Sequence, residues 1–372
     1  MKKAIIVISI IWIMTVQSGC VFEHPLNNPY NREESGQNIL YSSFTERPKH
    51  LDPVRSYSSN EYSIIGQIYE PPFQYHYLKR PYELIPLTAV GVPKPVYFGK
   101  DGEVLPSDVP DEKVAKAVYE IKIQQGIKYQ EHPAFAKDNQ GNYLYHDLTE
   151  KDMESIFELK DFKYTGSREL TASDYIYQIK RMANPLLHCP IFPIMVSYID
   201  GFAEYSKTIN QQLKKIRSER KAAAGAGYNQ ELDEQKNPIL LDLNAYPLKG
   251  VEEVDRYTFR ITLKTKYPQF VYWMAMPFFA PMPREAEVFY TQGSVLSRQI
   301  SLDWYPVGTG PYRLAVHNPN KEMVLLRNEN FHKELYPSEG FSEAGNKGLL
   351  EDAGKPLPFI EKIIYKLEKE SI

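Results

Sequence analysis

Cysteine and histidine are the residues of this chain best suited to nucleophilic or metal chemistry, and their spacing supports neither. The 372 residues include eight histidines and two cysteines, Cys20 and Cys189. A structural zinc site needs closely spaced Cys or His ligands and a zinc protease needs His-Glu-x-x-His, and neither pattern occurs. His188 precedes Cys189, but catalytic Cys and His residues usually meet from distant sequence positions. We interpret Cys189 as a buried or incidental thiol, and we expect no metal, no cofactor and no enzymatic activity.

Gly308-Thr309-Gly310 has two closely spaced glycines, as phosphate-binding loops do, but lacks the rest of that motif. Pro311 follows at once, and neither a third glycine nor a Lys-Ser/Thr pair occurs at the required spacing. We expect the two glycines to allow a tight turn with positive φ before a strand that begins at Tyr312. A Gly-x-Ser-x-Gly elbow, which would indicate a serine hydrolase, does not occur either.

The composition is that of an ordinary globular protein. The net charge is −3, with 24% charged and 42% hydrophobic residues, and the length allows two or three structural units. This near-neutral balance argues against a nucleic-acid partner, which would require a clustered basic surface. The 28 tyrosines are unusual. Tyrosine suits wet binding clefts, but it also builds β-rich cores, and composition leaves both interpretations open.

The elements that must position any site begin with a strand at residues 38–44. A helix is predicted next, with an apolar face containing Ile64 and Ile68, an N-cap at Ser59 or Asn60, and an end at the following prolines. Residues 118–123 alternate between apolar and polar side chains, which predicts a strand. The segment between these two elements is broken by prolines.

The second half predicts helices and strands without regular alternation. Thr171 and Asp174 form a capping box that begins a helix, which we expect to end at Asn184-Pro185. Residues 204–237 predict a solvated helix pair. Further strands are expected at 257–264, 312 onward, 323–326 and 363–367. This mixture indicates mixed α/β layers rather than a parallel barrel.

The first twenty residues have the layout of a secretory signal. Lys2 and Lys3 precede an apolar run at residues 4–16, and Ser18-Gly19 lies before Cys20. The apolar run is short for a membrane span, which needs ~20 residues. The segment resembles a bacterial lipoprotein signal, although Gln17 replaces the usual aliphatic residue. The resemblance implies lipidation of Cys20 and anchoring to a membrane.

Six further segments occur in the order typical of one family. They are Leu51-Asp52-Pro53 with Gln67-Ile68-Tyr69-Glu70; residues 119–129; Leu170 to Tyr177 with Lys180-Arg181; Val254 to Phe259; Pro281 to Ala286; and Gly308 to Tyr312 with Leu326 to Phe331. Together they resemble the family 5 extracellular solute-binding proteins of bacterial ABC importers, the oligopeptide- and dipeptide-binding group. Their agreement across residues 51 to 365 is the strength of the match, since each segment alone is weak.

The resemblance implies the class II periplasmic-binding-protein-like fold, an α/β fold of two lobes with mixed sheets. In that scheme the chain contains the first lobe with an inserted subdomain, and the second lobe is missing. The expected divisions are a signal at 1–20, a tether at 21–37, first-lobe segments at 38–70 and 271–365, the subdomain at 71–270 with expansions at 130–170 and 204–237, and the start of a hinge at 366–372.

The resemblance also implies a function in the cell envelope or periplasm. Two lobes would close on a peptide, and ABC permease subunits of the inner membrane would receive it. The expected ligand-binding residues are Tyr57, Ser58, Ser59, Asn60, Met276, Pro277, Phe278 and Phe279. Gly308, Gly310 and Tyr312 are expected to be structural signatures. Two alternatives are a truncated, non-binding envelope lipoprotein and, less favoured, an envelope hydrolase.

Overall fold

The computed structural model describes residue 34 and residues 36–345 and 347–368. The chain divides into two compact units, Met1–Asn38 and Ile39–Ile372. Cys20 and the other residues of the predicted signal lie outside the described residues.

The second unit mixes strands with helices, as the sequence predicts. The strands are β1 (Ile39–Phe44), β2 (Phe73–Tyr75), β3 (Leu84–Pro86), β4 (Val96–Phe98), β5 (Val104–Leu105), β6 (Lys116–Lys122), β7 (Val251–Asp255), β8 (Thr258–Leu263), β9 (Tyr312–Asn318), β10 (Glu322–Arg327), β11 (Glu334–Leu335), β12 (Pro356–Leu357) and β13 (Lys362–Leu367). The α-helices are α2 (Ser59–Ile65), α3 (Ala172–Arg181), α4 (Phe192–Tyr198), α5 (Phe202–Ala224), α6 (Gln230–Lys236), α7 (Phe270–Trp273), α8 (Arg284–Tyr290) and α9 (Gly293–Leu296). Short 3₁₀ turns include η3 (Pro133–Phe135), η4 (Leu159–Asp161), η5 (Gly225–Gly227) and η6 (Pro277–Phe279).

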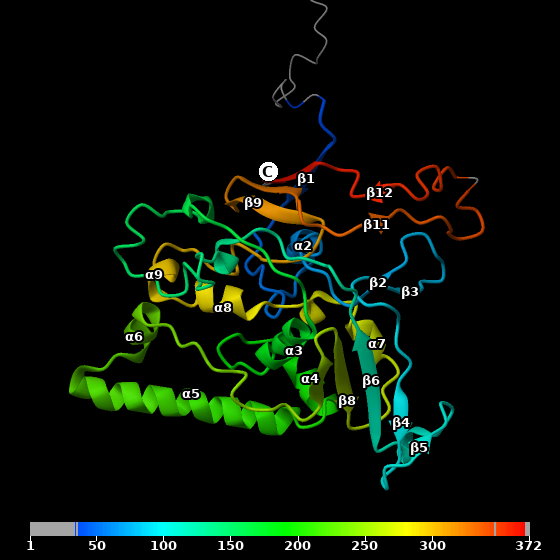
Figure 1. The fold of residues 1–372 in the computed structure, drawn as a ribbon, viewed down its shortest axis with the longest axis horizontal. Helices are drawn as coiled ribbons and strands as arrows, with labels where there is room; N and C mark the ends of the chain where they lie inside the picture. Colours follow the sequence, from blue (N-terminus) through cyan, green and yellow to red (C-terminus); the bar gives the residue numbers. More distant parts are fainter. Residues whose placement is uncertain (1–33, 35, 346, 369–372) are drawn as a thin grey trace, which may run out of the picture. The chain divides into compact units, whose positions relative to one another are not determined.

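Two larger sheets organise these elements (Figure 1). The four-stranded sheet has the order β1-β13-β10-β9, and the five-stranded sheet has the order β5-β4-β6-β8-β7. In the first sheet, β1 pairs in parallel with β13, in the register Ile39 opposite Lys362. Residues from the two ends of this unit therefore build one sheet, and β13 lies between β1 and β10.

The strands β6 and β8 form the centre of the five-stranded sheet, and both were predicted from alternation. They pair antiparallel, with Tyr119 opposite Ile261 and Ile121 opposite Phe259. These four side chains are almost completely buried. Burying one face of a strand fixes its register, because a one-residue slip would expose the whole apolar set.

The predicted helix after residue 58 is present as α2, but its N-cap prediction is wrong. Ser58 is the N-cap, in place of Ser59 or Asn60, and it forms a capping box with Glu61. The helix also ends earlier than expected, with Gly66 as its C-cap instead of the two prolines. A capping box needs an acidic side chain three positions after the N-cap. Of Ser58, Ser59 and Asn60, only Ser58 has one there.

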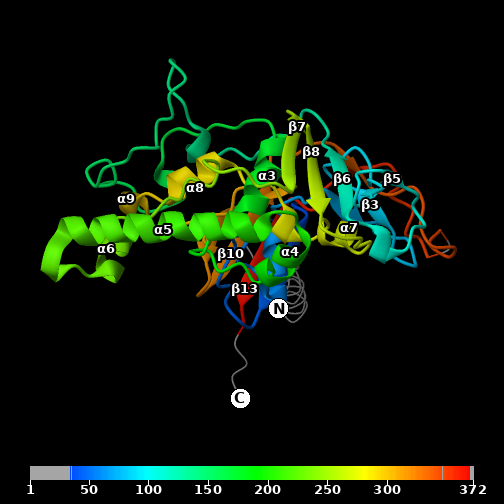
Figure 2. The ribbon, with the colours of Figure 1, turned by 90° about the horizontal axis from the view of Figure 1, so that it is seen from below.

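The capping box predicted at Thr171 and Asp174 is confirmed at the start of α3. The helix ends at Arg181, just before the expected Asn184-Pro185 stop. The predicted helix pair at 204–237 is also confirmed as α5 and α6. However, the first half of α5 is solvated on one face only, because Tyr205, Ile209 and Leu213 are buried on the other. Figures 1 and 2 show the rest of α5 running outward, with α6 beside its far end.

The expected positive-φ turn at Gly308 and Gly310 is wrong, because neither glycine has a positive φ. Instead, both lie against the backbone that follows α2. A Cβ added at Gly308 would lie 1.9 Å from the Ile68 carbonyl oxygen, and one at Gly310 would lie 2.7 Å from the same atom. The amide of Gly310 donates to that oxygen at 2.8 Å. These glycines are required for close packing of two chain segments, the second of which begins β9 at Tyr312 as predicted.

Residues 130–170 form an irregular, mostly polar segment as expected, but it has a buried anchor. The side chain of His132 is fully buried, and its Nε2 lies 2.8 Å from the hydroxyl of Tyr290 on α8. Burial lowers the pKa of His132 to about 3. The imidazole is therefore neutral at physiological pH and ties this segment to α8. Across the described ranges, no helix is long and apolar enough to cross a membrane.

Candidate functional site

The two segments predicted to bind ligand lie close together. The Tyr57 ring and the Phe278 ring are 6.2 Å apart between centroids. Tyr57 precedes α2 and is 74% exposed, whereas Phe278 belongs to η6 and is buried. The tertiary structure thus joins residues separated by more than two hundred positions at one surface.

Within the first predicted segment, Ser58 and Asn60 have structural roles. Ser58 is the N-cap of α2 and Ser59 is its first residue. The side-chain amide Nδ2 of Asn60 donates to the Glu46 carbonyl oxygen at 2.9 Å. Tyr57 and Ser59 therefore expose side chains that a ligand could contact, and Tyr57 offers the larger contact area.

Within the second predicted segment, exposure falls along the chain. Met276 is 39% exposed, while Pro277, Phe278 and Phe279 are buried. The Phe278 carbonyl oxygen accepts a hydrogen bond from the buried Gln178 side chain at 3.0 Å. Pro277 nevertheless lines a surface cavity. This segment therefore supports one wall of a potential binding site.

An acidic cavity of about 350 Å³ lies between α2, β2 and the segment that contains Pro277. Its lining is rich in tyrosine and includes two carboxylates: Tyr62, Gly66, Gln67, Tyr69, Glu70, Pro71, Phe73, Gln74, Tyr75, Tyr77, Leu87, Ala275, Pro277, Pro311 and Glu334. The main chain of Phe73 in β2 is tied to this wall, since its amide donates to the Met274 carbonyl oxygen at 3.3 Å.

The two carboxylates of the acidic cavity differ in their partners. Glu70 is buried, and its Oε1 lies 2.8 Å from Nε2 of His332. Burial raises the pKa of Glu70, an effect that the hydrogen bond from His332 opposes. Burial alone would lower the pKa of His332, but the hydrogen bond and charge of Glu70 outweigh it and raise that pKa. Glu70 and His332 thus form a pair at the cavity wall through Oε1, while Oε2 of Glu70 is buried without a hydrogen-bond partner.

Glu334, on β11, is the second carboxylate. Its Oε1 accepts hydrogen bonds from Nε2 of Gln74 at 2.8 Å and from the hydroxyl of Tyr77 at 3.2 Å. Burial raises the pKa of Tyr77, and the negative charge of Glu334 raises it further. The Tyr77 hydroxyl therefore stays protonated and donates. Within the described ranges, Glu334 has no ion pair with a lysine or arginine. It therefore offers a hydrogen-bonded negative charge at the cavity.

A basic cavity of about 620 Å³ adjoins the hairpin of β2 and β3 on the side of α7. Its lining combines cationic and aromatic side chains: Lys79, Arg80, Pro81, Tyr82, Glu83, Leu84, Val92, Val271, Tyr272, Gly340, Phe341 and Ser342. The guanidinium of Arg80 lies over the Tyr82 ring, 4.3 Å from its centroid. Such a cation–π contact orients the cation while leaving its edge available to an anion.

Tyrosine rings connect the two cavities. Tyr75 lines the acidic cavity, and its ring stacks on Tyr272 of the basic cavity at 6.4 Å between centroids. It also meets Tyr82 edge-on at 6.0 Å. We call the acidic cavity, the basic cavity and these three tyrosines the tyrosine groove. Its aromatic wall offers apolar contact area with hydrogen-bonding hydroxyls, which suits a ligand of mixed polarity.

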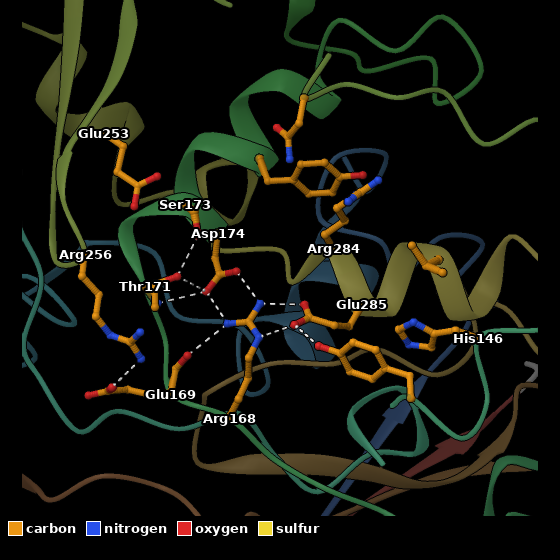
Figure 3. A pocket seen from close by; sticks show the side chains of 14 residues that line it. His146, Arg168, Glu169, Thr171, Ser173, Asp174, Glu253, Arg256, Arg284 and Glu285 are labelled. Carbon is orange, nitrogen blue, oxygen red and sulfur yellow. Dashed lines mark hydrogen bonds and ion pairs between the residues drawn. The ribbon is translucent and has the colours of Figure 1, made fainter. Parts of the chain in front are cut away.

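A third cavity, of about 510 Å³, is dominated by charged residues (Figure 3). Figure 3 shows the Arg168 guanidinium between Asp174 of α3 and Glu285 of α8. Arg168 donates to both Asp174 oxygens, at 2.8 and 2.6 Å, and to both Glu285 oxygens, at 2.7 and 2.8 Å. Nearby, Arg256 pairs with Glu169 at 3.0 Å.

These ion pairs explain the charged cavity without a ligand. Burial raises the pKa of Glu285, but its bonds with Arg168 outweigh that effect and lower the pKa. The carboxylate thus stays ionised and the pair persists at neutral pH. Arg168 belongs to the 130–170 segment, so the network fixes that segment to α3 and α8. We therefore favour the tyrosine groove as the candidate site.

The structure describes the surroundings of the Cys189 thiol and the grouping of possible metal ligands. Cys189 is buried, and burial raises the pKa of its thiol to about 11, which suppresses the reactive thiolate. Among the described residues, no group of three or more His, Cys, Asp or Glu side chains is placed to hold a metal ion.

Sequence reasoning missed most of the tyrosine groove. It singled out Pro277 and noted Glu70 within a motif, but it did not single out Arg80 or Glu334. A usable signal was present, because residues 69–82 contain four tyrosines among prolines and charged residues. Glu334 gave no such signal, since it reaches the groove from a position far along the chain.

Comparison with known proteins defines the class of this chain. A family model described as bacterial extracellular solute-binding proteins, family 5 Middle, matches residues 132–371. The fold is periplasmic-binding-protein-like, with mixed α/β content. The chain belongs to family 5 of the bacterial extracellular solute-binding proteins. No curated protein matches it.

Solved structures with a similar fold include three bacterial binding proteins. One is the periplasmic binding protein DppA from Helicobacter pylori in complex with the peptide STSA, at 15% identity and a TM-score of 0.46. The others are Listeria monocytogenes OppA bound to peptide, at 14% and 0.48, and the Escherichia coli murein tripeptide binding protein MppA, at 14% and 0.46. Each alignment covers 90% of this chain and 42–43% of the other. This chain therefore spans less than half the length of these proteins.

Proposed function

We propose that this chain is the substrate-binding component of an ABC importer and captures peptides in the cell envelope. Family membership supports a solute-binding role, and the tyrosine groove supports peptide as the solute. A groove that combines aromatic rings, hydroxyl donors and separate acidic and basic side chains suits a peptide, which carries amides, apolar groups and charged ends. The groove is the observation that carries this proposal.

The proposed binding surface includes the residues singled out from the sequence. Tyr57 and Met276 are exposed, and Pro277 lines the acidic cavity. In this proposal Ser58, Ser59, Asn60, Phe278 and Phe279 hold these side chains in place. Gly308, Gly310 and Tyr312 support the wall indirectly: the first two pack against Ile68, and the amide of Tyr312 donates to the Gln67 carbonyl oxygen at 3.0 Å.

The domain scheme and the location in the cell form part of the same proposal. Residues 38–70 and 271–365 would form a first lobe around a subdomain at 71–270, with 366–372 leading toward a hinge. Capture would involve closure against a second lobe, followed by delivery to permease subunits in the inner membrane. Lipidation of Cys20 would hold the receptor at a membrane in the periplasm, and the mass of the N-terminal peptide would test it.

Isothermal titration calorimetry of the full chain with defined peptides of two to five residues tests the function. We expect measurable binding and a rise in melting temperature, because a ligand that binds only the folded state stabilises it. The variant Tyr75→Ala should weaken binding about tenfold, since it removes the ring shared by both cavities.

The matched control is Tyr164→Ala, which removes another half-exposed tyrosine ring, from the 130–170 segment. It should bind peptides as the unmodified chain does. Absence of binding by any peptide would overturn the proposed function. Equal binding by the Tyr75→Ala variant would move the site away from the tyrosine groove.

A further inference from the structure

We propose that the outer face of α5 binds an anionic membrane surface through a row of three lysines, Lys207, Lys214 and Lys221. We call these three residues the lysine row. This surface shares no residue with the tyrosine groove. Its binding to a membrane is independent of peptide capture.

The lysine row is straight. Each lysine lies seven positions after the previous one. Seven residues complete nearly two turns of an α-helix, so side chains at this spacing project in almost the same direction. A rise of about 1.5 Å per residue places the lysines about 10 Å apart, and the row extends for about 20 Å. Figures 1 and 2 show α5 as one straight helix throughout.

The lysine row lies on a face that the fold leaves open. All three lysines are exposed, whereas the apolar residues Ile209 and Leu213 of α5 are buried. The α6 helix pairs with Arg217 and Arg220 and leaves the lysine row exposed. Neither the core nor the helix pair therefore accounts for these three side chains.

The other cations of α5 have acidic partners. Lys215 pairs with Glu219 at 3.9 Å. Arg217 and Arg220 pair with acidic residues of α6 at 2.7 and 3.1 Å. Within the described part of the chain, no member of the lysine row lies within ion-pair distance of an aspartate or glutamate.

The surroundings of the lysine row leave its charge uncompensated. The residues between the lysines on this face are Asn210, Gln211 and Ser218, which are uncharged. Glu204 lies one turn before the first lysine but forms no ion pair with it among the described residues. The face is therefore positive over its length and complementary to an anionic surface.

The composition of this face favours lipid over protein as the partner. Protein interfaces are enriched in aromatic residues, methionine and arginine, and they are depleted in lysine and serine. Their binding energy is concentrated in a few buried anchors that fill pockets. The lysine row has no such anchor beside it. A lipid surface requires none, because each lysine near anionic headgroups contributes separately to binding.

The length of the lysine row adds orientation to attachment. A single charge could hold the unit at a membrane in any orientation. Contact along about 20 Å of one rigid helix lays α5 parallel to the lipid surface. The lysine row would therefore determine which side of the unit faces the membrane.

Sedimentation of the full chain with lipid vesicles tests the lysine row. The probes are vesicles of phosphatidylcholine alone and vesicles with about one third phosphatidylglycerol. We expect tighter binding to the anionic vesicles. The combined variant Lys207→Gln, Lys214→Gln and Lys221→Gln should weaken that binding about a hundredfold, since each lysine contributes about fivefold. Raising the salt from about 0.1 to about 1 M should also weaken it, because the Debye length falls from about 10 to about 3 Å.

The matched control removes three exposed lysines elsewhere. The combined variant Lys94→Gln, Lys100→Gln and Lys113→Gln changes the net charge equally, at positions that flank β4 and β5. These strands lie away from α5 in Figures 1 and 2. This variant should bind anionic vesicles as the unmodified chain does. Residues 1–37 are identical in all three proteins, so their contribution to vesicle binding cancels.

A check of folding accompanies the comparison. Glutamine has nearly the helix propensity of lysine, so the circular dichroism spectrum of the lysine-row variant should match that of the unmodified chain. A loss of vesicle binding with an unchanged spectrum then reports the lost charges.

Several outcomes would overturn the inference. One is equal binding of both vesicle types by the unmodified chain. Another is unchanged binding by the lysine-row variant, or an equal loss of binding in the control variant. If soluble polyglutamate binds the lysine row while anionic vesicles do not, the partner is an acidic protein and lipid is overturned. Peptide capture is tested separately by calorimetry and stands or falls independently of these results.

Discussion

At the residue scale, the buried charge of Arg181 joins two segments that the family resemblance singled out. Its guanidinium donates to both oxygens of Asp52, at 3.0 and 2.6 Å, and to Glu287 at 3.1 Å, and its side chain is 1% exposed. Burial alone would lower the pKa of Arg181, but the two carboxylates outweigh it and raise that pKa. The segment Leu51-Asp52-Pro53 and the end of α3 are therefore fixed to each other and to α8.

Replacing Arg181 tests how strongly this network stabilises the fold. We expect Arg181→Met to lower the free energy of unfolding by about 3–5 kcal/mol, because it leaves two buried carboxylates without their cation. Urea denaturation monitored by circular dichroism measures the change. Arg217→Met is the control, since Arg217 pairs with Glu234 on the more exposed α5–α6 pair and should cost less than about 1 kcal/mol. Equal costs for the two variants would contradict this role of burial.

At the element scale, the capping box of α2 also positions the proposed binding surface. The Glu61 carboxylate accepts hydrogen bonds from the amides of His50, Lys49 and Tyr57, at 2.9, 3.0 and 3.1 Å. Burial would raise the pKa of Glu61, but its hydrogen bonds outweigh burial and lower the pKa from 4.5 to about 2. One carboxylate thus holds the loop that carries Tyr57.

The stabilisation by Glu61 should depend on pH. A carboxyl whose pKa is lowered on folding stabilises the native state above its unfolded pKa of 4.5, and this effect is lost as the pH falls toward 2. We expect Glu61→Gln to lower the free energy of unfolding by about 1 kcal/mol or more at pH 7. The difference from the unmodified chain should shrink between pH 4.5 and 2 in urea titrations. Glu150→Gln is the control, and a pH-independent difference for Glu61→Gln would contradict the assignment.

At the scale of the whole described unit, the four-stranded sheet makes folding depend on β13. This strand lies between β1 and β10, so its loss would remove a central strand and leave β1 without its partner. Exposed strand edges and apolar surface favour aggregation. The first and last strands of the unit must therefore come together before this sheet is complete.

A truncation tests this dependence. We expect a chain ending at Glu361 to lose its cooperative unfolding transition and to aggregate in size-exclusion chromatography. The control removes an equal length of chain, residues 219–229, which form the outer end of α5 and the turn that leads to α6. That deletion should keep the sheet and the cooperative transition. A truncated chain that stays monomeric and unfolds cooperatively would show that β13 is dispensable.

Local sequence patterns predicted many elements, because their cause is local. Alternation predicted the central strands β6 and β8, and the Thr171–Asp174 spacing predicted the start of α3. The same reasoning failed at Gly308, where the need for glycine comes from the carbonyl oxygen of Ile68, which is distant in sequence. It also placed the N-cap of α2 one or two residues too late, since it overlooked the spacing between Ser58 and Glu61.

The sequence by itself determined the family, the mixed α/β class and the segments on which family membership rests. The candidate site was decided by tertiary structure. Arg80, Glu334 and Tyr272 come from three separate parts of the chain, and their significance depends on which charges find partners in space. Periodicity and capping act over a few residues, so a sequence displays them directly. Charge pairing and cavity walls act between residues that only the folded chain brings together.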